Sequence, residues 1–351
     1  MIRLSIVMPS NRDSLAAFAR IAQACSWAGP QTEVIIRDNS GSPSKGRLLA
    51  QIQKDNCHII VSDPCEAHEN WAKAFEQAKG EFVFFLSDDD TCFDRAIADL
   101  PKTIEAVGHD PSVVGVTGTT FIDATQGASF VDYPNVDADE APTRLSGYLS
   151  SNSPNVILFS PVRRAAMKWV MEIINAKPFQ LSFDDQFSSM LYLLRGKYAR
   201  LNRILFCYDP HHWEKAETAQ REDLKFYAAA KLDPAINKLH WLLCAFEGAC
   251  LIRNLALTPN YSLAQRQIMA DRWFAVMFNR FKSHGRADFG SPLSANAEIL
   301  CAKWTLAAGQ LSFAALLADI CQFLALSSQE NSLKYFAFWS TIIGLRQAPA
   351  A

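Results

Sequence analysis

One short segment constrains the fold of this chain more than any other: an apolar run that ends in three consecutive carboxylates. Residues 82–86 read FVFFL, which is apolar on both faces, as in a central strand of a parallel sheet that helices cover on each side. Asp88, Asp89 and Asp90 follow at the carboxyl end of that strand. Ligands of open α/β sheets bind at this edge, because the loops there surround a crevice.

Three adjacent carboxylates repel one another, so holding them on a short turn is costly unless a cation or hydrogen-bond donors neutralise them. A hard divalent ion with oxygen ligands, shared with a diphosphate, meets that requirement. The alternative is an acidic turn that caps the following helix, since Asp is common at helix N-caps. The position directly after a buried strand favours the site for a cation and a diphosphate.

The composition limits the class of the protein and its partners. With 351 residues, of which 49% are hydrophobic, the chain can bury one large domain and a smaller one. A formal net charge of -2 gives no electrostatic reason to expect nucleic acid as a partner. The cysteines show no C-x-x-C spacing, which is typical of free thiols in a reducing compartment. The start of the chain reads as a strand, so we expect a cytoplasmic protein.

The first hundred residues alternate between strand-length and helix-length segments, which favours an α/β fold with a mostly parallel sheet flanked by helices. Gly80 is expected to end the third helix. A loop rich in Gly, Asp and Pro, residues 117–142, is a candidate wall of the active site. Strands are expected at residues 4–8, 33–36, 58–61, 82–86 and 113–117, and helices at residues 14–27, 45–54 and 69–79.

The strand signals stop near residue 215, after two expected helices at residues 163–175 and 183–194 and a strand within 198–208. The pattern beyond is almost wholly helical. We therefore predict two domains, residues 1–215 and a helical C-terminal domain of residues 216–351. The longest apolar segments of the second domain are interrupted by charged or polar side chains, so core helices are expected there rather than membrane spans.

Three segments together resemble glycosyltransferase family 2. SIVMPSNR at residues 5–12 is similar to that family's first strand and turn, and EVIIRDNS at residues 33–40 is similar to its second. In residues 69–90 a helix, a Gly and a strand lead into an acidic motif that resembles the family's metal motif, called DXD. The resemblance implies a GT-A fold, the Rossmann-like fold of nucleotide-diphospho-sugar transferases, for residues 1–215.

The resemblance also implies roles for the matching residues. Asp38 would read the base, a uracil N–H, Asp88 would reach the ribose, and Asp90 would coordinate Mn or Mg. Arg37 and Asn39 stand where the family carries an extra acidic residue or glycine, which leaves the identity of the base open. The residues assigned to the donor nucleotide and its diphosphate are Pro9, Asn11, Asp38, Asn70, Asp88 and Asp89.

Transfer to a hydroxyl with inversion needs a general base on the face opposite the leaving diphosphate. Asp184 and Asp185 begin an expected helix that ends near Gly196, and this segment resembles a family 2 helix that begins with an acidic pair. The family's base is the second of the pair, which matches Asp185. Spacing alone does not decide which carboxylate points inward, and a role in capping the helix is the alternative.

His211 and His212 follow an apolar strand, in the region where many GT-A enzymes supply a late histidine to the metal. An imidazole there would complete the coordination of an ion that already holds Asp90 and phosphate oxygens. A pair of loop histidines packed on Trp213 is the alternative.

Three other classes of protein compete with this interpretation. A haloacid-dehalogenase-type phosphatase also has an apolar strand followed by Asp-x-Asp, but it places that motif on its first strand. A nucleotidyltransferase would need a Gly-rich phosphate loop after the first strand, where PSNR has no glycine. A noncatalytic binding protein predicts that the acidic residues can be replaced without functional loss.

The sugar and the acceptor are not readable from the sequence, because specificity lies in pocket shape and loops. The resemblance implies transfer from a UDP-sugar to a glycan or lipid-linked glycan, in the assembly of surface polysaccharide or glycoconjugates. Acceptor binding, peripheral contact with the inner face of a membrane and an oligomer interface are the three roles open to the C-terminal helices.

Overall fold

The computed structural model describes residues 1–125, 127–151, 155–211, 216–254, 256–258, 260–307 and 312–344. The chain divides into two compact units. The first comprises Met1–Met171 and Ser189–His212, and the second comprises Glu172–Ser188 and Trp213–Ala351. One junction lies close to the expected boundary at residue 215. The helical unit also takes Glu172–Ser188, which the sequence-based boundary assigns to the first domain.

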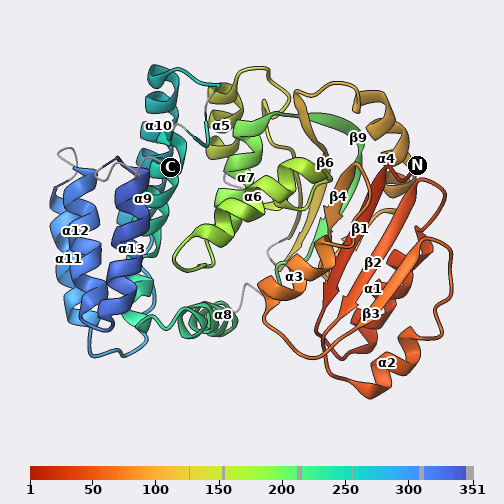
Figure 1. Ribbon diagram of the computed structural model, residues 1–351, viewed down its shortest axis with the longest axis horizontal. Helices are drawn as coiled ribbons and strands as arrows, with labels where there is room; N and C mark the ends of the chain where they lie inside the picture. The colour runs from red at the N-terminus through yellow and green to blue at the C-terminus, as the bar shows by residue number, and fades with distance from the viewer. Residues whose placement is uncertain are drawn as a thin grey trace, which may run out of the picture. The chain divides into compact units, whose positions relative to one another are not determined.

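The first unit is built on one sheet, in which the first four strands of the chain run parallel (Figure 1). The strand order is β3-β2-β1-β4-β8-β6-β9-β5, and β7 pairs with β6 outside that path. The expected α/β fold is confirmed. The bounds are β1 Leu4–Ser10, β2 Thr32–Asp38, β3 Cys57–Val61, β4 Phe82–Phe85, β5 Thr91–Cys92, β6 Val113–Ala124, β7 Gly127–Val131, β8 Val162–Arg163 and β9 Lys197–Tyr208.

Helices cover the sheet because its central strand is apolar on both faces. Phe82 and Phe84 of β4 pack in the main core with side chains from α1 and α4. Phe85 points the other way and contacts Trp71 of α3, with ring centroids 4.6 Å apart. Ser14 begins α1 by accepting a hydrogen bond from the backbone of that helix. The bounds are α1 Leu15–Ser26, α2 Pro43–Leu49, α3 Ala67–Phe75, α4 Asp94–Val107, α5 Ala141–Ser150 and α6 Arg164–Ala176.

Two local expectations are wrong. The expected loop at residues 117–142 is largely ordered structure: β6 continues to Ala124, pairs with β7 as a hairpin, and α5 begins at Ala141. Gly80 does not end a helix, because α3 already ends at Phe75. Its role is close approach, since a Cβ at this position would lie 2.6 Å from the backbone nitrogen of Ser5.

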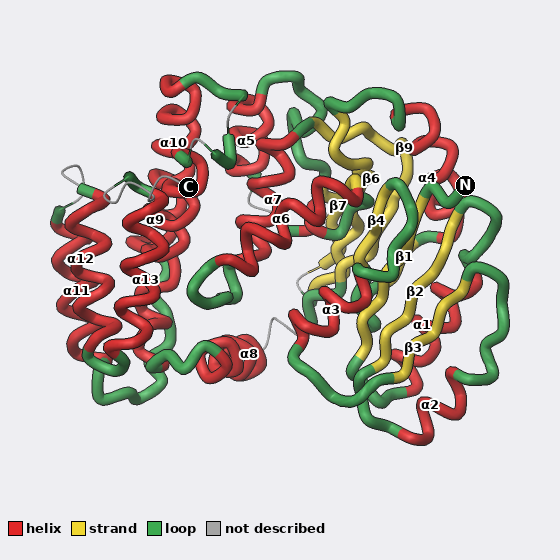
Figure 2. The backbone as a smooth tube through the Cα atoms, viewed as in Figure 1, coloured by secondary structure: helices red, strands yellow, loops and turns green. Residues whose placement is uncertain are grey.

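The second unit consists of helices in the part that the structure describes (Figure 2). The apolar stretch Pro234–Arg253 is long and apolar enough to cross a membrane, but its window is 89% buried inside the protein, as expected of a core helix. The bounds are α7 Asp184–Arg195, which begins in this unit and continues into the first, α8 Ala216–Ala229, α9 His240–Arg253, α10 Leu263–Ser283, α11 Ser294–Leu306, α12 Phe313–Ala325 and α13 Gln329–Ile342.

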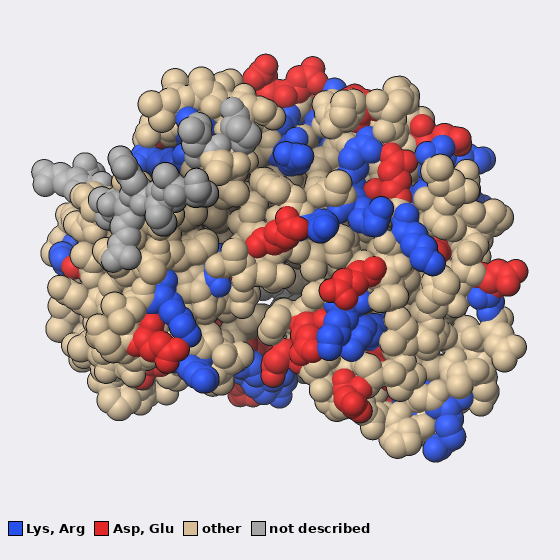
Figure 3. Space-filling model, viewed as in Figure 1, with Lys and Arg blue, Asp and Glu red and all other residues tan. Residues whose placement is uncertain are grey.

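Charged side chains of both signs are interspersed on the face of each unit that Figure 3 shows. Among the residues coloured there, neither sign forms a large continuous patch. This distribution agrees with the small net charge of -2.

Candidate functional site

Three neighbouring parallel strands end in a row of polar side chains at one edge of the sheet. Ser10 of β1 pairs with Asp38 of β2. β1 also pairs Val7 with Phe85 of β4, and continuing that register by three residues brings Ser10 opposite Asp88. Side chains in one row point to the same face. The row therefore continues the apolar face of the core beyond the strand ends, at the edge where ligands bind in such sheets.

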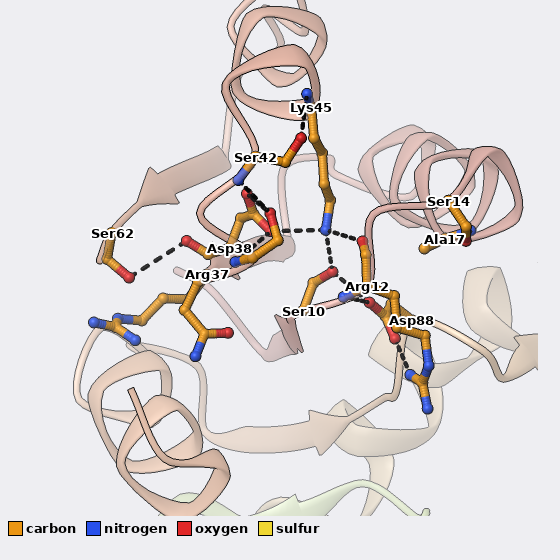
Figure 4. A network of polar contacts seen from close by, with 12 residues as sticks. Ser10, Arg12, Ser14, Ala17, Arg37, Asp38, Ser42, Lys45, Ser62 and Asp88 are labelled. Carbon is orange, nitrogen blue, oxygen red and sulfur yellow. Dashed lines mark hydrogen bonds and ion pairs between the residues drawn. The ribbon is translucent and has the colours of Figure 1, made fainter. Parts of the chain in front are cut away.

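Lys45 of α2 points its ammonium group into this row (Figure 4). Its Nζ donates to Asp38 Oδ1 at 2.7 Å, to Ser10 Oγ at 2.6 Å and to the carbonyl of Arg12 at 2.7 Å, which uses all three donors of a lysine. Ser10 Oγ in turn donates to Asp88 Oδ2. The side chains of Lys45 and Asp38 are 2% and 0% exposed, so a buried ammonium joins the two carboxylates.

Arg12 closes the row on the side of the solvent. Its guanidinium forms an ion pair with Asp88 and a second one, at 2.6 Å, with Asp89. Burial opposes the charged form of the guanidinium, but the charges of Asp89 and Asp88 outweigh it and raise the pKa of Arg12. We call Ser10, Arg12, Asp38, Lys45 and Asp88–Asp90 the sheet-edge cluster.

The donor set of this cluster fits a divalent cation. Burial and the charge of Asp89 raise the pKa of Asp90 to about 8, because the ionised carboxylate is costly at this position. Four carboxylates in the cluster face two cations among the described residues, Lys45 and Arg12. Ionisation of all four leaves two negative charges, which is the charge that one Mg²⁺ or Mn²⁺ balances, and both ions prefer oxygen ligands.

The chain that follows β9 runs beside the acidic motif. β5 pairs Thr91 with Cys207 of β9 in antiparallel register. Continuing that register by one residue brings Asp90 opposite Tyr208. The negative charge of Asp90 also acts on the thiol of Cys207, whose pKa is raised by burial and by neighbouring carboxylates. β5 begins immediately after Asp90. The segment that carries the expected histidines follows β9, the strand that pairs with β5.

His211 is exposed, and its Nδ1 forms a hydrogen bond with Asp209 Oδ1 at 2.6 Å. His212 lies outside the described residues. Within the described part of the chain, no three His, Cys, Asp or Glu side chains are grouped closely enough to hold a metal ion by themselves. The metal role of Asp90, His211 and His212 stays a prediction.

Asn70 belongs to a second polar cluster, not to the row. Its side chain donates to Asn39 Oδ1 at 2.9 Å and accepts a hydrogen bond from Arg37. Arg37 and Asn39 flank Asp38 in the sequence, and alternation along an extended chain turns them toward the opposite face from Asp38. The structure therefore joins Asp38 to Asp88 through Lys45 and Ser10, and it places Asn70 on the other side of β2.

The remaining donor-site residues differ in exposure. Pro9 is buried within β1, and Asn11 is exposed directly after that strand. Asp38 is fully buried, and its second carboxylate oxygen accepts from Ser40 Oγ at 3.0 Å. The contacts of these residues with a nucleotide stay predictions.

The two candidate bases lie at the start of α7, in the helical unit, and they differ in environment. Asp184 is buried, accepts a hydrogen bond from the backbone of Leu181 at 3.1 Å and forms an ion pair with Lys177. Lys177 forms a second ion pair with Glu247, at 2.9 Å. Asp185 is partly exposed. The hydrogen bond from Leu181 and the ion pair with Lys177 therefore hold the carboxylate of Asp184 inside the helical unit.

Ser10, Arg12 and Lys45 organise the sheet-edge cluster, and the sequence did not identify them as site residues. Ser10 and Arg12 lie within the turn that resembles family 2, so their place after the first strand was an available signal. Lys45 carries no local signal, because its partners come from the ends of two strands that the fold brings together.

Residues 5–129 match the family described as Glycosyl transferase family 2. This segment contains every member of the sheet-edge cluster. The acidic motif follows β4, in the order expected for that family, and does not follow a first strand as a phosphatase of the haloacid-dehalogenase type requires. Comparison with curated protein sequences gave no match.

Solved structures of a glycosyltransferase share the fold. S. aureus TarS 1–349 superposes with a TM-score of 0.52 at 14% identity, over 98% of this chain and 90% of that one. Its complex with UDP-GlcNAc gives 0.54 at 15% identity, over 98% and 91% of the two chains. A further TarS structure gives 0.55 at 15% identity, over 98% of this chain and 55% of that one. The shared fold confirms the expected GT-A fold, and residues 5–129 match glycosyltransferase family 2, in agreement with the resemblance that the sequence shows.

Proposed function

We propose that this protein transfers a sugar from a UDP-sugar to a hydroxyl group of a glycan or lipid-linked glycan, with inversion at the anomeric carbon. The observation that carries the proposal is the row of Asp38, Ser10 and Asp88, which Lys45 holds at the carboxyl edge of a family 2 domain. The complex of TarS with UDP-GlcNAc supports a uridine donor.

The contacts within the row define its chemistry toward a nucleotide. Asp38 accepts from the ammonium of Lys45 and Asp88 accepts from Ser10, so both side chains act as hydrogen-bond acceptors in the row. In the proposed complex they accept hydrogen bonds from donors of the nucleotide, a base N–H at Asp38 and a ribose hydroxyl at Asp88. Asp90, with His211 or His212, would hold Mn²⁺ or Mg²⁺, which neutralises charge on the leaving diphosphate.

Asp185 is the proposed general base. It accepts the proton of the acceptor hydroxyl while that oxygen bonds to the anomeric carbon, and the bond from this carbon to the diphosphate oxygen breaks on the opposite face. Asp184 does not take this role, because its carboxylate is paired with Lys177 inside the helical unit. We place the reaction in the cytoplasm, with an acceptor for surface polysaccharide or glycoconjugate assembly that is presented at the inner face of a membrane.

Calorimetric titration with UDP, in the presence and absence of Mn²⁺, tests the donor site. We expect binding of UDP that depends on Mn²⁺ and is weaker for GDP and ADP, and Asp90→Ala should remove the dependence on the metal. Absence of binding by every nucleoside diphosphate would contradict the proposed function.

Paired substitutions test the base. Asp185→Asn should lower the rate of UDP release from UDP-GlcNAc by roughly 10²–10⁴-fold, the usual contribution of general base catalysis, and leave UDP affinity within about twofold. Asp184→Asn should lower stability, because it removes a buried partner of Lys177, and leave the rate of the folded fraction nearly unchanged. The reverse pattern would assign the base to Asp184, and full activity of both variants would remove the acidic pair from the mechanism.

A further inference from the structure

Arg12 differs from the other cation of the sheet-edge cluster in its exposure. The side chain of Lys45 is 2% exposed, whereas that of Arg12 is 40% exposed. Both carboxylates that Arg12 binds belong to the acidic motif, and its two ion pairs use Nη1 for Asp88 Oδ1 and Nη2 for Asp89 Oδ2. The guanidinium therefore binds two carboxylates of the motif that are adjacent in sequence to Asp90, the residue proposed to hold the metal ion.

The backbone of Arg12 is fixed although its side chain reaches solvent. The carbonyl of Arg12 accepts a hydrogen bond from the buried ammonium of Lys45 at 2.7 Å (Figure 4). A long side chain on a fixed backbone can exchange partners by rotation of its own bonds, while the strand end keeps its place. Lys45 keeps its partners during such an exchange, because Asp38 and Ser10 lie in the buried part of the cluster.

A divalent ion held by Asp90 would lie beside the guanidinium, whose charge already interacts with Asp90, and the two like charges would repel each other. A cation bound by the motif therefore weakens the pairing of Arg12 with Asp88 and Asp89. A diphosphate offers new partners, since a guanidinium presents its N–H groups as a planar fork that matches two oxygens of a phosphate group.

We propose that Arg12 is an exchangeable counter-cation: it holds Asp88 and Asp89 while the donor site is free, and its guanidinium moves to the diphosphate of a nucleoside diphosphate when a divalent ion joins the motif. The inference rests on the proposed function for the identity of the anion. By this inference, Arg12 competes with the metal ion for the acidic motif in the free protein and binds the diphosphate of the donor in the complex.

The test compares Mn²⁺ alone with UDP in saturating Mn²⁺, both by calorimetry on the full chain. Arg12→Met should bind Mn²⁺ alone about two- to fivefold more tightly, since it removes a half-exposed competing pair. The same variant should bind UDP roughly tenfold or more weakly, since it loses charge-assisted bonds to phosphate. Arg12→Lys keeps the charge without the fork, so its Mn²⁺ affinity should stay near that of the wild type while UDP binding weakens.

Arg47→Met is the matched control, because Arg47 is an exposed residue of α2 outside the cluster. It should leave both affinities within about twofold of the wild type. Opposite changes in the two affinities of Arg12→Met support the exchange, because a merely structural role would weaken both. Unchanged Mn²⁺ affinity, or weakening of both ligands in a variant with native circular dichroism, would overturn it.

If Arg12→Met does not fold, Arg12→Lys decides, and equal UDP affinity of this variant and the wild type overturns the exchange. If the wild type binds Mn²⁺ but no nucleoside diphosphate, the proposed function fails, and the role of Arg12 toward the donor fails with it. Tighter Mn²⁺ binding by Arg12→Met would then still show that the arginine competes with the metal, so the two failures are distinguishable.

Discussion

Each unit of this chain buries a lysine between polar partners, and the two lysines differ in what surrounds them. Lys45 lies beyond the ends of parallel strands, and its network continues through Ser10 to Asp88 and the half-exposed Arg12. Lys177 lies in the helical unit between Asp184 and Glu247, with its side chain 1% exposed. The first network therefore reaches solvent at a sheet edge, and the second is enclosed.

Aromatic rings enclose Lys177. Its Nζ lies 5.1 Å and 4.7 Å from the ring centroids of Phe183 and Phe187, within the range of cation–π contacts. Tyr335 donates to Glu247 Oε1 at 3.0 Å. The 2.9 Å contact between Lys177 and Glu247 Oε2 is an ion pair without good hydrogen-bond alignment, since that oxygen has no hydrogen-bond partner in the described part of the chain.

The comparison shows that a buried charge does not by itself mark a ligand site. What distinguishes the sheet-edge cluster is its place at the carboxyl ends of parallel strands and its half-exposed, exchangeable arginine. The network of Lys177 instead fastens Glu172–Ser188 to the helical unit, because Lys177 and Asp184 lie in that segment and Glu247 lies in α9. These contacts explain why Glu172–Ser188 belongs to the helical unit, although the sequence-based boundary assigns it to the first domain.

The largest effect is expected for Lys177→Met. Removal of the ammonium leaves Asp184 and Glu247 buried without their cation, which should lower the free energy of unfolding of the helical unit by about 3–5 kcal/mol. Hydrogen exchange measured by mass spectrometry separates the two units. Peptides of α9 and α13 should lose protection, and peptides of β1 and β2 should keep theirs.

Lys303→Met is the control for that loss. The side chain of Lys303 is 55% exposed and pairs with Asp319, so its removal should cost less than about 1 kcal/mol. Equal loss of protection in the two variants would mean that the enclosed network contributes no more than a surface ion pair.

A smaller loss of stability is expected for Lys45→Met. Asp38 loses its cation but keeps its hydrogen bond from Ser40, so the cost should be about 2–3 kcal/mol, confined to peptides of β1, β2 and α2. UDP binding should fall by roughly tenfold or more, since Asp38 and Asp88 lose their common support. Unchanged UDP affinity in a folded Lys45→Met variant would mean that Lys45, like Lys177, stabilises the fold without supporting the donor site.

Sequence patterns predict β1–β4, parts of β6 and β9 and part of the cluster, but not β5, β7 or β8. Successive side chains of a strand point to opposite faces of the sheet. The even-numbered residues of β1, β2 and β4 therefore share one face with Ser10, Asp38 and Asp88. The acidic motif after a buried strand was therefore readable without a structure. Its partners on neighbouring strands became evident only once the register was known.

Contacts between distant parts of the chain account for what the sequence did not show. Lys45 appeared as one residue of an expected helix, although its partners come from β1 and β2. Asp184 appeared only as a candidate base, and the sequence did not show that it pairs with Lys177, which also pairs with Glu247 of a later helix. The hairpin of β6 and β7 was taken for a loop, since the Gly and Asp residues typical of turns lie within its strands.

The smallest predicted effect is a dependence of the helical unit on pH. Burial raises the pKa of Glu247 to about 7, from 4.5, in spite of the opposing charge of Lys177, and burial also raises the pKa of Asp184. A carboxyl group whose pKa is raised by folding binds its proton more tightly in the folded state, so its stabilising effect is full below about pH 4.5 and is lost as pH rises to about 7.

The free energy of unfolding, from urea titration followed by circular dichroism, should therefore fall by roughly 1–2 kcal/mol between pH 5 and pH 7.5. Protection of α9 peptides, corrected for the intrinsic exchange rate, should fall with it. Glu247→Gln should flatten this slope, because the amide does not titrate, and its hydrogen bond with Tyr335 can persist. A slope that Glu247→Gln leaves intact would assign the titration to Asp184, and stability that rises with pH would mean that Lys177 keeps Glu247 ionised throughout.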